Sequence, residues 1–405
     1  MPIDRRTFLP ALLGASAAHA QSPAPSPGPR YFDVVRDIYP MRTGIKRMSR
    51  RELQFPPLGE YRVVTGDFHI HTLYSEGTVM PSVRLYEAWT EGVDVVAITD
   101  HAEFLRTSLP EKRGRAFEEV RELAAAMGLL LIRGAEVSTV YSADGELMSQ
   151  VTARKNTDFI VLFVEDENAL FAPFDVAMER ARSQGCINIW AHPGPEWGPI
   201  PQKFLEMGWL HGVEMRNTVT SAGTTVEQFA GSHFYPQAAV WAREKGLSLI
   251  ASSDVHSPAQ FERPTGALRD FTLLLVKEPT QAGVREALLA RRTMAWFDGM
   301  VWGRGEDLAL LARHSLRIAP MRVDGKLQGL LLRNACSIPL EVEVDPAARL
   351  LRLPPRAHTV PALGSAIVPA GVPSGAAPTE IEVRVRNLYL DRQTNLRLPL
   401  PVTNG

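Results

Sequence analysis

Short apolar runs recur along residues 59–303, and they alternate with segments whose apolar residues have helical spacing. The runs themselves show no apolar–polar alternation, which is typical of strands buried on both faces of a parallel sheet or barrel. Alternating strands and helices with short connections favour an α/β fold. The predicted strands are residues 66–70, 93–98, 129–133, 158–164, 186–190, 212–216, 247–251 and 271–276. The predicted helices are residues 83–90, 115–127, 174–184, 237–245 and 284–290.

The pattern changes after about residue 303. Residues 304–405 carry short strand-like runs punctuated by Pro, Gly and Asn. This pattern predicts a small antiparallel, β-sandwich-like domain with a stabilising or interaction role. Its predicted strands are residues 329–333, 340–344, 350–353, 380–385 and 396–402.

Candidate metal ligands stand at the ends of the predicted strands of the first region. One His-x-His pair, His69 and His71, is weak evidence, because alternate residues of any strand point to one face. The recurrence is more informative, since five of the ten histidines and two carboxylates follow predicted strands. Barrel enzymes place their chemistry at such strand ends. These residues are His69, His71, His101, Glu136, His192, Asp254 and His256.

Neutral imidazoles together with carboxylates bind borderline divalent ions, so we expect two or three ions of manganese, zinc or iron. Glu136 is the natural candidate to bridge two of them, and bridged ions favour hydrolysis, most naturally at phosphorus. Asp67 and Asp100 lie close to ligand candidates. Each is therefore either a carboxylate that orients a ligating histidine or a strand-end cap.

The first 20 residues have the features of an export signal. Arg5 and Arg6 form a twin-arginine pattern, a short apolar stretch follows, and Ala18-His19-Ala20 offers a cleavage site. A general secretory signal is the alternative. Residues 21–58 then form a linker and an N-terminal extension, and the predicted location is the periplasm or the exterior of the cell.

Charge and composition exclude some classes of partner. The chain has 44 basic and 45 acidic residues, and loss of residues 1–20 changes its net charge only from −1 to −2. This balance does not indicate a nucleic-acid or membrane surface, and no run is long and apolar enough for a membrane span. The expected partner is a small-molecule phosphoester. The two cysteines, Cys186 and Cys336, are predicted to be buried free thiols.

The motifs together resemble the polymerase-and-histidinol-phosphatase (PHP) superfamily and, within it, bacterial phosphodiesterases that act on small organophosphate diesters. The resemblance covers about residues 55–400. It implies an α/β fold with a distorted (β/α)₇ barrel at residues 59–303 and the β-rich domain at residues 304–405. The matching segments are His69-Ile70-His71-Thr72, Ser75-Glu76-Gly77, Ile98-Thr99-Asp100-His101, Gly134-Ala135-Glu136, His192-Pro193-Gly194 and Ser253-Asp254-Val255-His256.

The resemblance also implies which residues hold each ion. The ligands of a first ion would be His69, His71, Glu136 and Asp254. The ligands of a second ion would be Glu76, His101 and His256.

A third ion would use Glu136, His192 and a further histidine, and here the chain departs from the family pattern. Asp158 stands at the position that aligns best with that histidine, and Glu76 stands where aspartate is usual. A carboxylate can replace an imidazole, but it adds negative charge and favours harder ions. Asp158 is therefore either a ligand or a solvated residue at the start of a strand.

Substrate contacts are expected after two of the predicted strands. Arg216 and Asn217 follow one strand, and Arg263 lies in the loop after His256. An arginine at such a place either clamps phosphate oxygens or forms a surface salt bridge. The roles of two further pairs are open. His233 and Tyr235 either donate a proton to the leaving group or only pack in the core. Trp190 and Trp197 either line a pocket for an apolar ester group or belong to the core.

The function that follows is hydrolysis of phosphoesters, most naturally small phosphodiesters, by a metal-activated hydroxide. The catalytic residues would be Glu136, His192 and Asp254, with His192 as one candidate acid for the leaving alkoxide. A phosphomonoesterase with the same site is the first alternative. A carbon-centre hydrolase is the second, although that class commonly needs a lysine carbamate where this chain has Glu136. A non-catalytic metal-binding protein is the third, and an exonuclease is disfavoured because no basic, aromatic-rich groove is indicated.

Overall fold

A computed structural model describes residues 49–103, 114–139, 157–217, 233–262, 268–344, 357–369 and 379–403. The predicted signal segment and most of the predicted linker lie outside these ranges, as does Arg263. Within the described ranges, no helix combines the length and the apolar character needed to cross a membrane.

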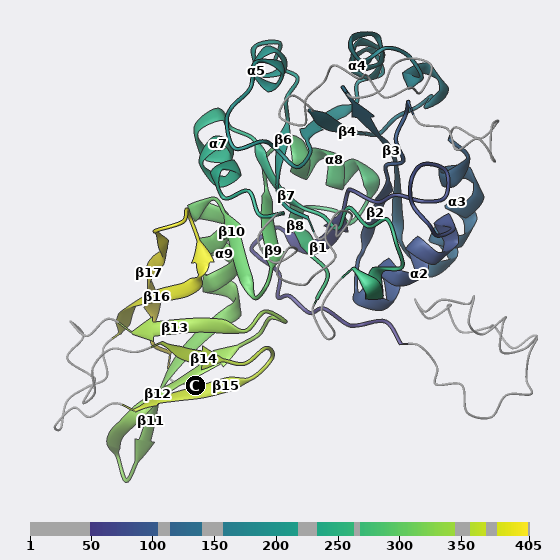
Figure 1. The fold of residues 1–405 in the computed structure, drawn as a ribbon. Helices are drawn as coiled ribbons and strands as arrows, with labels where there is room; N and C mark the ends of the chain where they lie inside the picture. The colour runs from purple at the N-terminus through teal and green to yellow at the C-terminus, as the bar shows by residue number, and fades with distance from the viewer. Residues whose placement is uncertain are drawn as a thin grey trace, which may run out of the picture.

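The first part of the chain alternates strands and helices, and the helices surround the central strands (Figure 1). The strands are β1 (Arg62–Asp67), β2 (Val95–Ile98), β3 (Leu130–Ser138), β4 (Asp158–Leu162), β5 (Ile187–Trp190), β6 (Gly212–Arg216), β7 (Ser248–Ala251), β8 (Phe271–Val276), β9 (Thr293–Phe297) and β10 (Met300–Gly303). The helices are α2 (Pro81–Glu91), α3 (Arg115–Met127), α4 (Phe174–Ser183), α5 (Pro199–Glu206), α7 (Gln237–Lys245) and α8 (Gln281–Leu289), with short 3₁₀ helices η2 (Asn168–Leu170) and η3 (Ala259–Phe261).

The local sequence explains most of these elements. Every residue of β2, β5 and β7 is buried, as their unbroken apolar runs require. Helix α3 ends at Gly128, whose φ of 72° lies in the left-handed region that favours glycine. Helix α5 was not predicted, because its two prolines resemble a loop. Pro199 stands at the helix start, where proline is compatible with helical geometry.

The sheet is rich in parallel pairs but is not wholly parallel. Parallel pairing joins β1 to β2, β2 to β3, β5 to β6 and β6 to β7. Strand β4 runs antiparallel to both β3 and β5, and β8 runs antiparallel to both β1 and β9. The expectation of a purely parallel arrangement is therefore wrong at β4 and β8. The apolar pattern of one strand does not reveal its direction, because parallel and antiparallel strands of this sheet are both short, buried apolar runs.

The direction of β4 has a consequence for the chemistry. Its first residue, Asp158, pairs with Ser138 at the end of β3, and the adjacent Phe159 pairs with Trp190 at the end of β5. Because β4 is reversed, its N-terminal end meets the C-terminal ends of its neighbours. Asp158 therefore lies at the edge of the sheet that also carries the candidate ligands of β3 and β5.

The sheet curves so that β7 approaches β8 and β9. The amide of Ala251 in β7 donates to Thr272 Oγ1 at 3.0 Å, and the amide of Leu249 donates to Thr293 Oγ1 at 3.0 Å. Side-chain hydroxyls of β8 and β9 thus satisfy buried backbone amides of β7, which would otherwise be costly to bury.

The C-terminal part is β-rich, as predicted, but it begins with a helix that was not predicted. Helix α9 (Gly305–Ser315) buries Leu308, Leu311 and Ala312. The following strands are β11 (Leu316–Val323), β12 (Lys326–Asn334), β13 (Leu340–Val344), β14 (His358–Val360), β15 (Ser365–Pro369), β16 (Glu380–Tyr389) and β17 (Asn395–Pro401). Strands β11, β12 and β15 form a separate sheet, whereas β16 pairs in parallel with β10 and so joins the main sheet. The predicted strand at residues 350–353 lies outside the described residues.

Residues 49–58, which belong to the predicted N-terminal extension, pack on the body of the protein. Arg50 Nη1 donates to the carbonyl of Val93 at 2.8 Å, the amide of Gln54 donates to Ser337 Oγ at 2.7 Å, and Leu58 is fully buried. Both cysteines are free and buried, as predicted.

We predict that Arg269→Met destabilises the protein by about 3–5 kcal/mol, because it leaves the carboxylate of Asp67 buried without its cation. Arg269 and Asp67 are both almost fully buried and form an ion pair, and Arg269 Nε also contacts Glu91 at 2.6 Å. Urea unfolding of the purified variant measures the change. Arg392→Met is the matched control, since that arginine is exposed. Equal unfolding midpoints for the two variants would contradict the prediction.

Candidate metal centre

The ends of five strands bring the predicted ligands into one cluster. His69 and His71 follow β1, and His101 follows β2 and forms a bridge with Glu136 of β3. His192 follows β5. The segment after β7 lies beside the segment after β1, since Ile70 and Val255 form an isolated bridge. A cavity of about 320 Å³ opens onto the cluster, and its lining residues are His101, Glu136, His192, Asn217, His233, Tyr235, Asp254 and His256.

The innermost group contains the two histidines of the His-x-His pair. Their Nε2 atoms lie 3.1 Å apart. Glu136 Oε2 lies 3.2 Å from both Nε2 atoms, and Asp254 Oδ1 lies 3.2 Å from that of His69 and 3.1 Å from that of His71. The structure thus brings together the four residues expected to hold a first ion.

A second group surrounds Glu76, nearer to solvent. Glu76 Oε1 lies 3.0 Å from His71 Nδ1, 3.3 Å from His101 Nε2 and 2.9 Å from His256 Nε2. The residue after Glu76 must be a glycine, because a Cβ on Gly77 would lie 2.7 Å from the backbone nitrogen and oxygen of Thr72. Glutamate therefore reaches the place where the family usually has aspartate.

A third group lies on the other side of Glu136. Glu136 Oε1 is 3.0 Å from His192 Nε2, and Asp158 Oδ2 is 3.7 Å from the same atom. The other oxygen of Asp158 is buried and has no hydrogen-bond partner within the described ranges. A buried carboxylate oxygen without a partner is costly, so a cation at this place would complete its environment.

The spacing of these atoms fits bound ions. An ion about 2.1 Å from each of its ligands holds neighbouring ligands roughly 3.0–3.4 Å apart. Most nitrogen–oxygen distances in the first two groups fall in this range. The donor set of imidazoles and carboxylates suits zinc, manganese or iron. The residues present therefore fit two or three divalent cations.

Protons and cations compete for these ligands. Burial opposes protonation of His69, but the carboxylates of Asp254 and Glu136 outweigh burial and raise its pKa well above the usual value. The pKa of His192 rises to about 9 because its contacts with Glu136 likewise outweigh burial. Burial would raise the pKa of Asp254, yet the facing histidines lower it to about 2. Divalent cations bind deprotonated imidazole, so loading of the centre releases protons.

Two carboxylates that orient ligating histidines were missed by the sequence analysis. Glu214 of β6 is buried, its Oε1 lies 3.2 Å from His69 Nδ1, and its Oε2 accepts from the amide of His192 at 2.7 Å. Glu103 Oε1 lies 2.9 Å from His101 Nδ1. Each carboxylate favours the tautomer with the proton on Nδ1, which leaves the Nε2 lone pair for a cation. The amino-acid sequence did offer one signal for Glu214, because it is a charged residue inside the otherwise apolar run of β6.

Asp67 and Asp100, the two carboxylates expected either to orient histidines or to cap strands, bind backbone and hydroxyl groups. Asp67 Oδ1 accepts from the amide of Ser253 at 3.0 Å. Asp100 accepts from the amide and the hydroxyl of Thr72, each at 2.6 Å. These contacts to backbone and hydroxyl groups are those of the capping alternative.

The predicted substrate contacts are only partly at the cavity. Asn217 lines it, but Arg216 does not, because its guanidinium lies 3.3 Å from Asp270 and 3.3 Å from Asp298. The salt-bridge alternative therefore describes Arg216. The cavity is also lined by His233 and Tyr235.

The tryptophans near His192 belong to the core. Trp190 is buried and stacks on Trp241 with ring centroids 5.2 Å apart. Trp197 meets both rings edge-on, at 5.4 Å from each. Neither Trp190 nor Trp197 lines the cavity, so packing is their role in the described structure.

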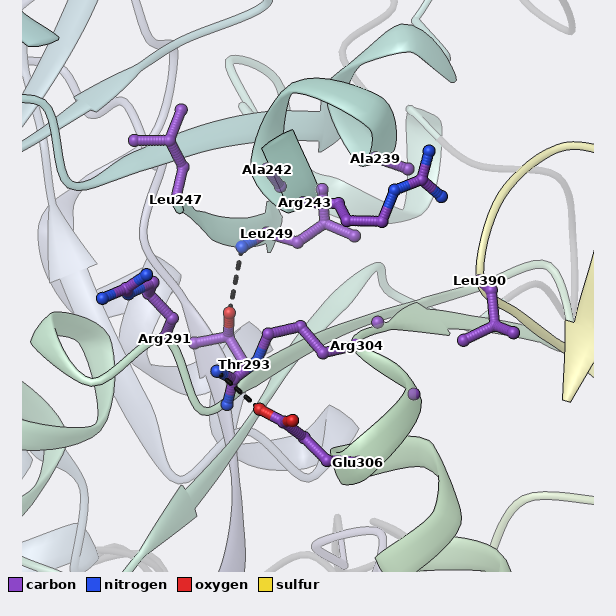
Figure 2. A pocket seen from close by; sticks show the side chains of 12 residues that line it. Ala239, Ala242, Arg243, Leu247, Leu249, Arg291, Thr293, Arg304, Glu306 and Leu390 are labelled. Atoms are coloured by element: carbon purple, nitrogen blue, oxygen red, sulfur yellow. Dashed lines mark hydrogen bonds and ion pairs between the residues drawn. The ribbon is translucent and has the colours of Figure 1, made fainter. Parts of the chain in front are cut away.

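A second cavity, of about 260 Å³, lies between α7, β7, β9 and the start of α9 (Figure 2). Arg243, Arg291 and Arg304 line it beside apolar side chains. Arg304 pairs with Glu306 at 2.8 Å, as Figure 2 shows, and Arg243 pairs with Asp391 at 3.1 Å. Its described lining contains none of the clustered histidines, so this cavity is separate from the candidate metal centre.

We predict that Glu214→Gln weakens metal binding about 10- to 100-fold, the range typical of residues that orient metal ligands. The amide keeps the size of the side chain, but it places a donor against the amide of His192 or the Nδ1 proton of His69. Competition with a chelator of known affinity measures the change. Glu244→Gln is the control, since Glu244 is exposed on α7. An unchanged affinity in Glu214→Gln would refute the orienting role.

Comparisons with known proteins agree with this geometry. A solved structure of a two-domain protein from Bacteroides vulgatus, described as containing a predicted PHP-like metal-dependent phosphoesterase, is 28% identical to this chain. Its TM-score is 0.73, and the match covers 89% of this chain and 100% of that protein. An uncharacterized protein of Methanocaldococcus jannaschii is 25% identical over 193 residues, which are 47% of this chain and 81% of the relative.

No family model matches the chain. The fold shared with the Bacteroides protein and the grouped histidines and carboxylates nevertheless support a PHP-superfamily phosphoesterase.

Proposed function

We propose that the protein is a metal-dependent phosphoesterase that acts on small phosphodiesters. The observation that carries this proposal is the position of Glu136 between groups of ligands. Its Oε2 faces His69, His71 and His101, and its Oε1 faces His192. A carboxylate placed in this way can bridge ions. Divalent ions in such a site activate water and stabilise charge on the attacking and leaving oxygens of a phosphoester.

Contacts of the ligating histidines with neighbouring groups of the protein hold their rings in the orientation that this reaction needs. Glu214 and Glu103 fix two ligating imidazoles, and the backbone carbonyl of Asp254 lies 2.8 Å from His256 Nδ1. Three histidines therefore present Nε2 towards the centre of the cluster. His192 is the most exposed of the ligating histidines, so it is the candidate to hold or deliver a proton at the leaving oxygen.

The charge of the cavity supports a diester over a monoester. Among the described residues that line it there is no lysine or arginine, and Arg216 is occupied by two aspartates. A monoester dianion carries more negative charge than a diester monoanion. Without fixed cations beyond the bound ions, the smaller charge is easier to hold beside Glu136 and Asp254. A phosphomonoesterase using the same centre is the alternative.

The first experiment measures metal content and turnover in the same sample. We expect two or three ions per chain by inductively coupled plasma mass spectrometry, and cleavage of bis(p-nitrophenyl) phosphate faster than of p-nitrophenyl phosphate. Removal of the ions by a chelator should abolish turnover, and added manganese or zinc should restore it. Bound ions with no turnover of either ester would reject the proposal in favour of carbon-centre hydrolysis or metal binding alone.

His69→Ala and Asp254→Ala should each reduce diester turnover to background while the protein stays folded, because both residues are expected to hold the same ion. His314→Ala is the matched control, since its Nδ1 contacts only the carbonyl of Leu310 within α9. Circular dichroism monitors folding and the p-nitrophenol release assay monitors turnover. Normal activity in either centre variant would refute the ligand assignment.

Asp158→His should raise the occupancy of the third group, because it supplies the imidazole that the family pattern has at this position. Metal content per chain, measured on protein equilibrated with a fixed low concentration of free zinc, reports the change. Asp175→His is a control for adding an imidazole at an exposed place on α4. Unchanged stoichiometry in Asp158→His would count against a third ion at this position.

A further inference from the structure

One wall of the cavity is made of neutral polar side chains that are not candidate metal ligands. Among the described lining residues these are Asn217, His233 and Tyr235. The backbone holds them together, since the amide of Asn217 donates to the carbonyl of His233 at 3.2 Å and the amide of Tyr235 donates to that of Met215 at 2.8 Å. We call these three residues the polar wall. They follow or flank the end of β6, beside the ligand-bearing ends of β5 and β7.

Asn217 is fixed in one orientation by its donors. Its Nδ2 donates to Glu214 Oε2 at 3.1 Å and to Asp254 Oδ2 at 3.1 Å. Turning the amide over would place its oxygen against two carboxylate oxygens, which is electrostatically unfavourable. The Oδ1 atom is consequently the acceptor that remains, and it is buried without a hydrogen-bond partner among the described residues, in a side chain that is 0% exposed.

A buried acceptor without a partner is rare in folded proteins, and each case calls for a cause such as a ligand. Here the side chain lines the cavity that also exposes the candidate metal ligands. A ligand in this cavity that offers a hydrogen-bond donor would satisfy Asn217 Oδ1.

His233 and Tyr235 add hydrogen-bonding capacity to the same wall. Neither side chain forms a hydrogen bond through its polar atoms within the described part of the chain, and both are half-buried at the cavity. Burial lowers the pKa of His233 and raises the pKa of Tyr235, so both are neutral near pH 7. A neutral imidazole and a phenol each donate and accept.

The chemistry of the polar wall selects among possible alcohol groups of an ester. The wall carries no carboxylate for a cationic group and no guanidinium for a second phosphate. A purely apolar alkyl or aryl group would leave its three polar side chains without partners, which is costly. Hydroxyl groups, which both donate and accept, match it best.

We propose that the polar wall binds the alcohol portion of the ester, that Asn217 Oδ1 accepts a hydrogen bond from a hydroxyl of that portion, and that the substrates are phosphodiesters of polyols. This inference rests on the proposed phosphodiesterase function. It names Asn217 and Tyr235 as specificity-determining residues, distinct from the ligands that hold the ions.

Two synthetic diesters that differ only in hydroxyl groups test the inference. We compare kcat/KM for 2,3-dihydroxypropyl p-nitrophenyl phosphate and propyl p-nitrophenyl phosphate on the metal-loaded, full-length protein, with the enzyme-free rate subtracted. We expect the dihydroxypropyl ester to be preferred by about fivefold or more, as loss of a hydrogen bond in a buried polar site predicts. Tyr235→Phe and Asn217→Leu should each lower this ratio.

The ratio of the two kcat/KM values separates loss of hydroxyl recognition from general damage to the protein, because a merely structural defect slows the cleavage of both esters alike. Tyr389→Phe is the matched control, since Tyr389 stacks on Trp302 and does not line the cavity, and its ratio should equal that of the unmodified protein. Equal kcat/KM values for the two esters would overturn the inference and leave the phosphodiesterase proposal standing. A preference that survives in both Tyr235→Phe and Asn217→Leu would also overturn it. Cleavage of neither ester would overturn the proposed function and the inference together.

Discussion

The burial of carboxylates beside imidazoles at one edge of the sheet is the constraint on which the rest of the structure depends. Glu136, Glu214 and Asp254 are almost fully buried, and isolated buried charges are very costly. Each is compensated by contacts from several strands rather than by one partner. Glu136 is shared by histidines from three strand ends, and Asp254 receives both an imidazole and the amide of Asn217. The centre is therefore stable only when all the strand ends meet in register.

Hydrogen bonds of buried charged side chains around the cluster hold the strand ends in this register. Arg84 of α2 is fully buried, and its guanidinium donates to the carbonyls of His71 at 2.8 Å, Val255 at 3.1 Å and Ser257 at 2.8 Å. One side chain thus ties the segment after β1 to the segment after β7. Asp67 makes a second link between the same segments, because it accepts from the amide of Ser253. Backbone groups of ligand-bearing segments are satisfied by charged side chains, which leaves the ligand side chains free to face the cavity.

The sequence was sufficient to find the clustered candidate ligands but not the carboxylates that orient them. His69, His101, His192 and Asp254 could be found because each follows a short apolar run, and that pattern is local. The role of Arg216 was left open between a phosphate clamp and a salt bridge, because Asp270 and Asp298, which contact its guanidinium, are distant in the chain. The reversal of β4 was also invisible, since a short buried run has the same composition in either direction. Long-range pairing decided these cases, and no local pattern encodes it.

The same reasoning explains why the proposed polar wall lies beside the end of β6. The other strand ends of the cluster carry candidate metal ligands, and these side chains contact one another. Strand β6 contributes Glu214, which orients His69, and Asn217 follows the strand directly and lines the cavity. A residue that orients a ligating histidine and a residue that faces the substrate are thereby held by one rigid element. In the proposed binding mode, the Asn217 amide would link the position of the ester to both Glu214 and Asp254, because its Nδ2 donates to both carboxylates.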